Sequence, residues 1–142
     1  MVDELDYEFD ERVWNMAEAM EKENLPESEG TVDVFENMNC ALSLRFYKEE
    51  LVVGPGIARL MELVDRTGSI SESCRVMNMA YSKAWKLIKR SEAAAGCELF
   101  SGSRGGRNGG RTRLTAEGER LLLKYRDMEN KLKELMLSEF ER

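Results

Sequence analysis

Histidine is absent from the 142-residue sequence, and only three cysteines are present. Without an imidazole the chain has no Ser-His or Cys-His pair, and a hydrolase would need carboxylates or a lysine in a pocket that the sequence does not reveal. The cysteines are far apart and form no CxxC pair, so no zinc site is expected. We therefore predict that the protein is not an enzyme and that it uses no metal ion and no cofactor.

Long apolar runs are also missing from the sequence. It contains no signal peptide and no run of about 18 apolar residues, which a membrane-spanning helix would need. The odd number of cysteines fits reduced, buried thiols at Cys40, Cys74 and Cys97 rather than disulfides. These features predict a cytoplasmic protein that does not contact a membrane.

Charge is unevenly distributed along the chain. The net charge is −6, but residues 1–40 contain 13 acids and 2 bases, a net charge of −11. Residues 69–126, in contrast, contain 12 bases and 5 acids, a net charge of +7. The overall acidity therefore hides a basic region. We divide the chain into an acidic N-terminal extension at residues 1–39, partly helical or disordered, and a single domain at residues 40–142.

Two short helices joined by a tight turn are predicted within residues 67–95. Gly68 can end one helix in the left-handed conformation, and Ser69 followed by Glu72 is a capping box that begins the next helix. Asn78 tolerates the left-handed turn position. A further helix over residues 81–95 has an apolar stripe. The stripe consists of Tyr81, Ala84, Trp85 and Ile88.

The opposite face of the helix at residues 81–95 is polar and basic. A short helix and a turn, followed by a helix that exposes cations, form the arrangement that reads the major groove of DNA. We predict that Lys83 and Lys86 contact base edges or nearby phosphates, whereas Tyr81 and Trp85 belong to the core. The residues assigned to the DNA-facing side of this helix are Ser82, Lys83, Lys86, Lys89 and Arg90.

A hairpin rich in glycine and arginine follows this helix. Strand-like runs at residues 99–101 and 112–115 flank it, and no acidic residue lies between Leu99 and Ala116. Glycines let a backbone approach phosphates closely, and arginines supply charge for a groove or for phosphates. Taken alone, the segment fits a solvated basic loop equally well, but behind a helix-turn-helix it predicts a DNA-binding wing. The wing arginines are Arg104, Arg107, Arg111 and Arg113.

The elements before the turn contribute mainly to the core. Alternation over residues 40–47 places Leu42, Leu44 and Phe46 on one side and predicts a half-buried strand. After residues 54–56, a first helix is predicted that ends at residues 67–68. Its core stripe consists of Ile57, Leu60, Met61 and Val64.

A long helix is predicted from Thr115, its N-cap, toward Arg142, with Gly118 small enough to admit another backbone. Apolar residues recur along it at alternating spacings of four and three, as in a coiled coil. Because such a helix outruns a domain of this size, its far half is predicted to form a dimer contact, with a solvated overhang as the alternative. The seam consists of Leu121, Tyr125, Met128, Leu132 and Leu135.

Four short motifs carry a family resemblance: TGSIS at residues 67–71, YSKAW at 81–85, GGRNGG at 105–110 and LT at 114–115. With this order and spacing, residues 42–135 resemble the N-terminal DNA-binding domain of the ModE family of molybdate-responsive transcriptional regulators. The resemblance implies a winged helix-turn-helix that dimerises and regulates transcription. LysR-type regulators have a similar winged DNA-binding half.

The sequence departs from the ModE pattern in two places. Ala80 replaces a serine that opens the recognition helix, and Ser82 stands where the family has a lysine, with Lys83 one position later. Full-length family members also carry C-terminal oxyanion-binding domains, whereas this sequence ends at Arg142. We therefore do not expect an oxyanion-sensing domain or molybdate sensing.

Together these features predict a mainly α fold with a small β component, a winged helix-turn-helix with a long C-terminal dimerisation helix. The expected function is a homodimeric transcriptional regulator that binds double-stranded DNA. The alternative is a protein-interaction module whose winged-helix fold no longer binds DNA. The N-terminal extension has a weak amphipathic stripe and either packs on the domain or a dimer mate, or acts through its charge. This stripe consists of Phe9, Val13, Met16 and Met20.

Overall fold

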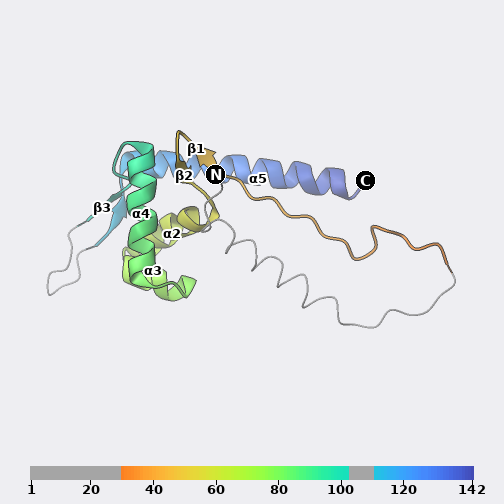
Figure 1. The fold of residues 1–142 in the computed structure, drawn as a ribbon, viewed down its shortest axis with the longest axis horizontal. Helices are drawn as coiled ribbons and strands as arrows, with labels where there is room; N and C mark the ends of the chain where they lie inside the picture. Colours follow the sequence, from red (N-terminus) through yellow and green to blue (C-terminus); the bar gives the residue numbers. More distant parts are fainter. Residues whose placement is uncertain (1–29, 103–110) are drawn as a thin grey trace. The chain divides into compact units, whose positions relative to one another are not determined.

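The structure is a computed structural model that describes residues 30–102 and 111–142 (Figure 1). The chain divides between Asn39 and Cys40 into two units. The second unit is a winged helix-turn-helix, mainly α with a small β component, as predicted. Its elements are β1 (Phe46–Tyr47), β2 (Leu51–Val53), α2 (Pro55–Thr67), α3 (Ile70–Met77), α4 (Tyr81–Ala95), β3 (Phe100–Ser101), β4 (Arg113–Leu114) and α5 (Ala116–Phe140).

The described part of the first unit, residues 30–39, is exposed and contains one turn. The Glu36 N–H donates to the Asp33 carbonyl oxygen at 3.0 Å, and Asn37 has a φ of 60°. The helix predicted from Phe9, Val13, Met16 and Met20 lies outside the described residues. The acidic extension over residues 1–39 therefore stays a prediction.

The predicted strand over residues 40–47 is shorter than expected. Only β1, Phe46–Tyr47, is paired, and its antiparallel partner is β2, Leu51–Val53. Leu42, Leu44 and Phe46 are half-buried and Tyr47 is exposed, as predicted, but Arg45, predicted on the opposite side, is half-buried as well. Pairing stops early because the partner strand has only three residues.

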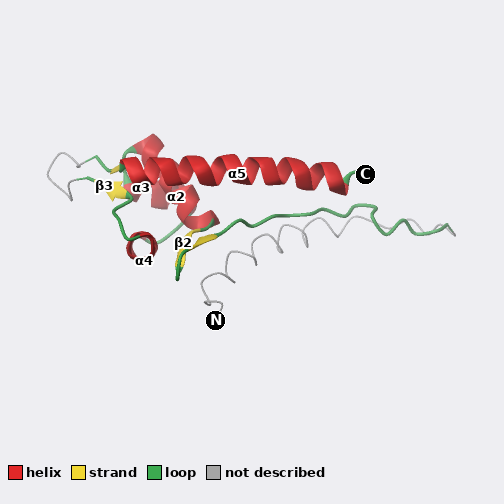
Figure 2. Cartoon of the chain, turned by 90° about the horizontal axis from the view of Figure 1, so that it is seen from above, coloured by secondary structure: helices red, strands yellow, loops and turns green. Residues whose placement is uncertain are grey.

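Helix α2 forms the centre of the second unit and has the predicted core stripe. Pro55 occupies its first turn, where a missing N–H is tolerated, and Gly68 ends it with a φ of 69°. Figure 2 shows α2 between α4 and α5. The predicted stripe residues are all buried: Ile57, Leu60, Met61 and Val64.

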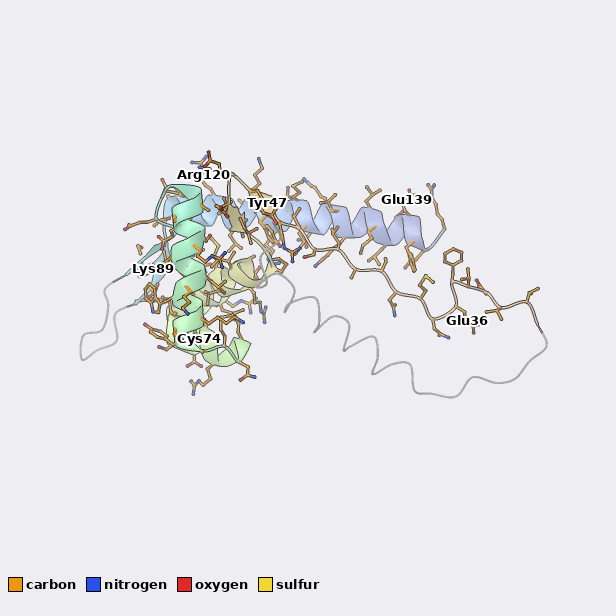
Figure 3. The ribbon with its side chains drawn as sticks, in the orientation of Figure 1. Glu36, Tyr47, Cys74, Lys89, Arg120 and Glu139 are labelled. Atoms are coloured by element: carbon orange, nitrogen blue, oxygen red, sulfur yellow. The ribbon has the colours of Figure 1, made fainter. Side chains whose placement is uncertain are left out.

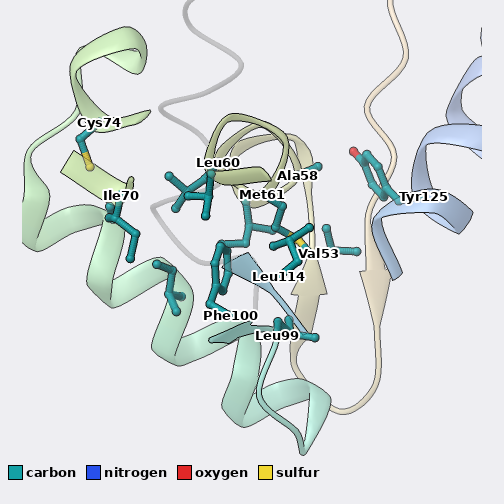
Figure 4. Packing of buried hydrophobic residues seen from close by; sticks show 14 residues of the cluster. Val53, Ala58, Leu60, Met61, Ile70, Cys74, Leu99, Phe100, Leu114 and Tyr125 are labelled. Carbon is teal, nitrogen blue, oxygen red and sulfur yellow. The ribbon is translucent and has the colours of Figure 1, made fainter. Parts of the chain in front are cut away.

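The hydrophobic core joins residues from both hairpins and all four helices of this unit (Figure 4). Leu99 and Phe100 bring the base of the wing hairpin into this core, with exposed fractions of 1% and 8%. A buried hydrogen bond joins α4 to β2, because the Ser91 hydroxyl donates to the Val52 carbonyl oxygen. The wing base and α4 are thus held by the same core.

The start of α5 packs closely on the wing hairpin. The Thr115 hydroxyl accepts the Gly118 N–H at 3.0 Å, which confirms the predicted N-cap, and donates to the Glu98 carbonyl oxygen at 2.7 Å. A Cβ at Gly118 would lie 2.2 Å from the Leu99 carbonyl oxygen. Glycine at this position therefore lets the two backbones touch, as expected.

About two turns further along α5, Tyr125 and Arg126 bind the helix to the rest of the unit. Tyr125 is fully buried, and its hydroxyl donates to the Leu44 carbonyl oxygen at 2.8 Å. The Arg126 guanidinium forms two hydrogen bonds with Glu62 on α2, through Nε and, at 2.8 Å, through Nη2. A further bond joins its Nη1 to Glu129 at 2.6 Å. Burial lowers the pKa of Arg126, but these two carboxylates outweigh it and raise the pKa above its ordinary value.

The three cysteines are free thiols in different environments. Cys74 is buried in the core, and burial raises the pKa of its thiol. Cys40 is only half-buried and Cys97 is exposed, so the prediction of three buried thiols is wrong for Cys97. Cys97 lies in the short connection from α4 to the wing hairpin, next to the exposed Gly96 that ends the helix.

No helix within the described ranges is both long enough and apolar enough to span a membrane. Across residues 30–102 and 111–142, cysteine and carboxylate side chains form no group of three that could hold a metal ion.

Candidate nucleic-acid interface

The helix-turn-helix is built by local signals at each of its junctions. The Ser69 hydroxyl accepts the Glu72 N–H at 3.1 Å, so the predicted cap begins α3. Glu72 itself forms an ion pair with Arg75. Asn78 has a φ of 52° and ends α3 in the left-handed conformation, as predicted. These caps fix where α3 begins and where it ends.

Ala80 is the N-cap of α4 and provides no side-chain acceptor for the first N–H groups of the helix. A serine, threonine, asparagine or aspartate at this position would satisfy one of these donors. The departure from the family pattern at Ala80 therefore leaves α4 without a side-chain cap.

Replacing Ala80 by serine should stabilise the protein by about 1 kcal/mol, because the new hydroxyl can accept an N–H of the first turn. Urea unfolding of Ala80→Ser beside the parent chain measures the change. Ala80→Val is the matched control, since it adds atoms at the same exposed position without an acceptor. Equal stability of the serine and valine variants would contradict the missing-cap interpretation.

Helix α4 buries one face and exposes the other. Ala84, Ile88 and Ser91 are buried against the core. All five residues assigned to its DNA-facing side are exposed, and Figure 3 shows the side chains of this region with Lys89 labelled. These five are Ser82, Lys83, Lys86, Lys89 and Arg90. A basic, exposed second helix of this kind is suited to a polyanionic groove.

Tyr81 corrects the prediction that both aromatic residues of α4 belong to the core. Its side chain is 51% exposed, whereas Trp85 is half-buried and packs against the core. The two rings meet edge to face, with centroids 6.1 Å apart and planes at 78°. Tyr81 lies on the apolar stripe, but it is the first residue of α4 and extends past the edge of the core.

The wing strands pair as predicted. Phe100 pairs with Leu114 and Ser101 pairs with Arg113 in an antiparallel hairpin. The Arg113 and Arg111 side chains are exposed at its base. Arg104 and Arg107, at the predicted tip, lie outside the described residues.

Gly68, which lies between α2 and α3, contacts the wing. The Thr112 N–H donates to the Gly68 carbonyl oxygen at 2.9 Å, and the Arg111 side chain crosses the Gly68 Cα. A Cβ at Gly68 would lie 2.8 Å from the Arg111 Cγ. Sequence patterns did not indicate this contact, because it joins residues far apart in the chain.

The predicted dimer seam on α5 divides into two parts. Tyr125 is fully buried in its own domain, so its assignment to a dimer contact is wrong, and Leu121 is half-buried against the same core. Leu121 and Tyr125 lie on the predicted seam because the apolar stripe of α5 packs against its own domain over the first turns of the helix. Beyond them, Met128 is 41% exposed, Leu135 is 58% exposed, and Leu132 is half-buried.

Comparison with known proteins matches residues 58–119 to the bacterial regulatory helix-turn-helix proteins of the lysR family. The molybdenum transport protein ModE of Azotobacter vinelandii is 38% identical over 71 residues, which cover 50% of this chain and 26% of that protein. The transcriptional regulator ModE of Haemophilus influenzae is 29% identical over 89 residues, which cover 63% of this chain and 34% of that protein. The molybdenum-pterin-binding protein MopB of Rhodobacter capsulatus is 29% identical over 103 residues, which cover 72% of this chain and 38% of that protein.

The matched segments thus span about a quarter to two fifths of the length of these relatives. The lysR-family match begins within α2 and ends in the first turn of α5. It therefore contains the helix-turn-helix and the whole wing hairpin. Residues 58–119 are thus similar to the helix-turn-helix of the bacterial regulatory lysR proteins, and the chain is similar to the ModE regulators over the segments given above.

Proposed function

We propose that this protein is a dimeric, sequence-specific DNA-binding transcriptional regulator. It reads the major groove with α4 and places its wing on flanking DNA. The observation that carries the proposal is the exposed basic face of α4, which follows the capped helix α3 in a helix-turn-helix. The transcriptional regulator ModE of Haemophilus influenzae, similar over this region, supports it.

Within this proposal, the position of each basic residue determines whether it contacts base edges or the DNA backbone. Lys83 and Lys86 lie in the first two turns of α4, the part of a recognition helix that reaches base edges. Lys89 and Arg90 lie further along the helix, where phosphates of the groove wall come closer. The wing arginines contact backbone or minor groove of the flanking DNA. These wing residues are Arg104, Arg107, Arg111 and Arg113.

The affinity for duplex DNA should fall steeply with salt, by about 0.9 log units per log unit of salt for each phosphate that is neutralised. Replacing Arg104, Arg107 and Arg111 by alanine should weaken binding to all sequences alike and flatten this slope.

Replacing Lys83 or Lys86 by alanine should weaken binding to the preferred site more than binding to random DNA, by about 1–3 kcal/mol for a base-edge contact. Fluorescence anisotropy at several salt concentrations measures both effects.

The preferred site is first selected by the wild-type protein from a random DNA pool. Lys131→Ala is a suitable control, because Lys131 is an exposed lysine on α5 whose ion pair is with Asp127. Equal losses on preferred and random DNA would make Lys83 and Lys86 backbone contacts. If no duplex is bound even at low salt, the domain is a protein-interaction module instead.

The far half of α5 supports the dimeric part of the proposal. At 25 residues the helix is about 38 Å long, and only its first part packs on the domain. The remaining stripe of Met128, Leu132 and Leu135 is a self-complementary surface for a second copy related by a two-fold axis.

Introducing a charge into this stripe should separate the dimer. We expect the double variant Leu132→Glu/Leu135→Glu to sediment as a monomer at concentrations where the parent chain is a dimer. Leu123→Glu is the matched control, because Leu123 is 73% exposed on another face of the same helix. A parent chain that sediments as a monomer, or an unchanged mass for the double variant, would refute the contact.

A further inference from the structure

Tyr81 is a large aromatic side chain that the core does not cover. It is the first residue of α4, and 51% of it is exposed. Its ring is nevertheless oriented, because its edge-to-face contact is with Trp85, which is itself packed against the core. A ring held in this way loses little conformational entropy when it meets a ligand.

The surroundings of Tyr81 indicate which ligand it meets. Ser82, Lys83 and Lys86 are exposed beside it on the same end of α4. Ala80, the residue before it, has only a methyl group and makes no side-chain hydrogen bond to the helix end. In helix-turn-helix proteins the N-terminal residues of the second helix contact base edges. Tyr81 is therefore placed where α4 would enter the major groove.

The chemistry of the groove then selects the contact. Among the four bases, only thymine presents an apolar group in the major groove, its 5-methyl, and apolar side chains contact it there. We propose that Tyr81 determines specificity by packing its ring on the methyl group of a thymine in the binding site. This inference rests on the proposed DNA-binding function and adds a residue to its base-reading set.

The test replaces the methyl group and the ring independently. The DNA site that the wild-type protein selects is synthesised with each thymine changed in turn to deoxyuridine, which removes only the methyl. For the wild-type protein, one position in each half-site should lose about fourfold in affinity, the effect of exposing one buried methyl group. Tyr81→Ala should bind the unmodified site more weakly and should show no loss at that position. Tyr81→Phe should behave as the wild type does.

Tyr47→Ala is the matched control, because Tyr47 is 59% exposed and lies on β1. Its neighbour Lys48 contacts Ala95 at the opposite end of α4 from Tyr81. This variant should keep both the affinity and the methyl effect of the wild type. Melting temperatures of both alanine variants establish that they are folded.

Several results would overturn the inference. Tyr81→Ala could bind as Tyr47→Ala does, or it could keep the full methyl effect of the wild-type protein. A loss in Tyr81→Phe as large as in Tyr81→Ala would assign the contact to the phenol hydroxyl. In each case the wild-type protein still binds its selected site, so the role of Tyr81 fails alone. Absence of any selected site would instead defeat the proposed function.

Discussion

Replacing Tyr125 by alanine should lower the free energy of unfolding by about 3–5 kcal/mol, the cost of deleting a large buried aromatic side chain. The ring is fully buried and meets Phe46 edge to face, with centroids 5.4 Å apart. The Tyr125 side chain joins α5 to the segment before β1, so its loss opens a cavity between them. Urea unfolding of the variant and the parent chain measures the effect.

Tyr125→Phe separates the hydroxyl from the ring. It should cost only about 0.5–1.5 kcal/mol, because it removes the bond to the Leu44 carbonyl and leaves the packing in place. Burial, together with the charge of Glu129, raises the pKa of Tyr125 to about 12 from 10.0. The group is therefore neutral in the folded state over a range where it ionises in the unfolded state.

The stability that this neutral phenol contributes is fully present below pH 10 and is lost as pH rises toward about 12. The loss should be on the order of 3 kcal/mol at most, and Tyr125→Phe should lack it. Parallel alkaline profiles for the parent chain and the phenylalanine variant would contradict this assignment. A Tyr125→Ala variant as stable as Tyr125→Phe would show that the ring is not part of the core.

Replacing Gly118 by alanine should destabilise the protein by about 1–3 kcal/mol, although the same change in an exposed helix stabilises by about 1 kcal/mol. The reason is the backbone contact with Leu99, where an added Cβ would be 2.2 Å from the carbonyl oxygen. A backbone atom cannot move aside as a flexible side chain does, so α5 and the wing hairpin must separate. Thermal or urea unfolding checks the sign.

Gly96→Ala is the matched control for this prediction. Gly96 has a φ of 77° and no atom within 4 Å of an added Cβ, so its substitution tests left-handed strain alone. That strain amounts to about 1–2 kcal/mol. Stabilisation in Gly118→Ala would mean that α5 does not touch the Leu99 backbone.

Local signals in the sequence were sufficient for most of the fold. Gly68, Asn78 and Gly96 all have the left-handed φ that ends a helix, and Ser69 and Thr115 cap the helices that follow them. Such caps depend on residues within one turn, so a linear pattern records them fully. The wing strands were also predicted locally, as short strand-like runs on either side of the segment rich in glycine and arginine, and they pair through Phe100 and Leu114.

The errors arose where burial depends on distant residues. Periodicity placed Tyr81 and Tyr125 on apolar stripes correctly, but it could not show where the core ends along each helix. Tyr81 extends past that edge, and Tyr125 lies inside it. Strand β2 was missed because Leu51, Val52 and Val53 form an apolar run too short to show a period.

The candidate site was predictable as a set of charges but not as a geometry. Exposure of Lys83, Lys86 and Lys89 follows from their position opposite Ala84 and Ile88 on one helix. The Thr112–Gly68 contact joins two segments separated by α3 and α4, and no local pattern specifies such a pair.

That contact has a consequence for how the domain could acquire new targets. The wing and the α2–α3 junction are joined through a backbone donor and a backbone acceptor, which side-chain substitutions do not remove. The exposed face of α4 takes no part in this joint, so its residues are free to be exchanged one at a time. Evolution or design can therefore change the preferred DNA site by replacing a few exposed residues of α4, while the distance between α4 and the wing stays the same. The same joint sets a limit, because a binding site that needs a different spacing between groove and wing cannot be reached by such replacements.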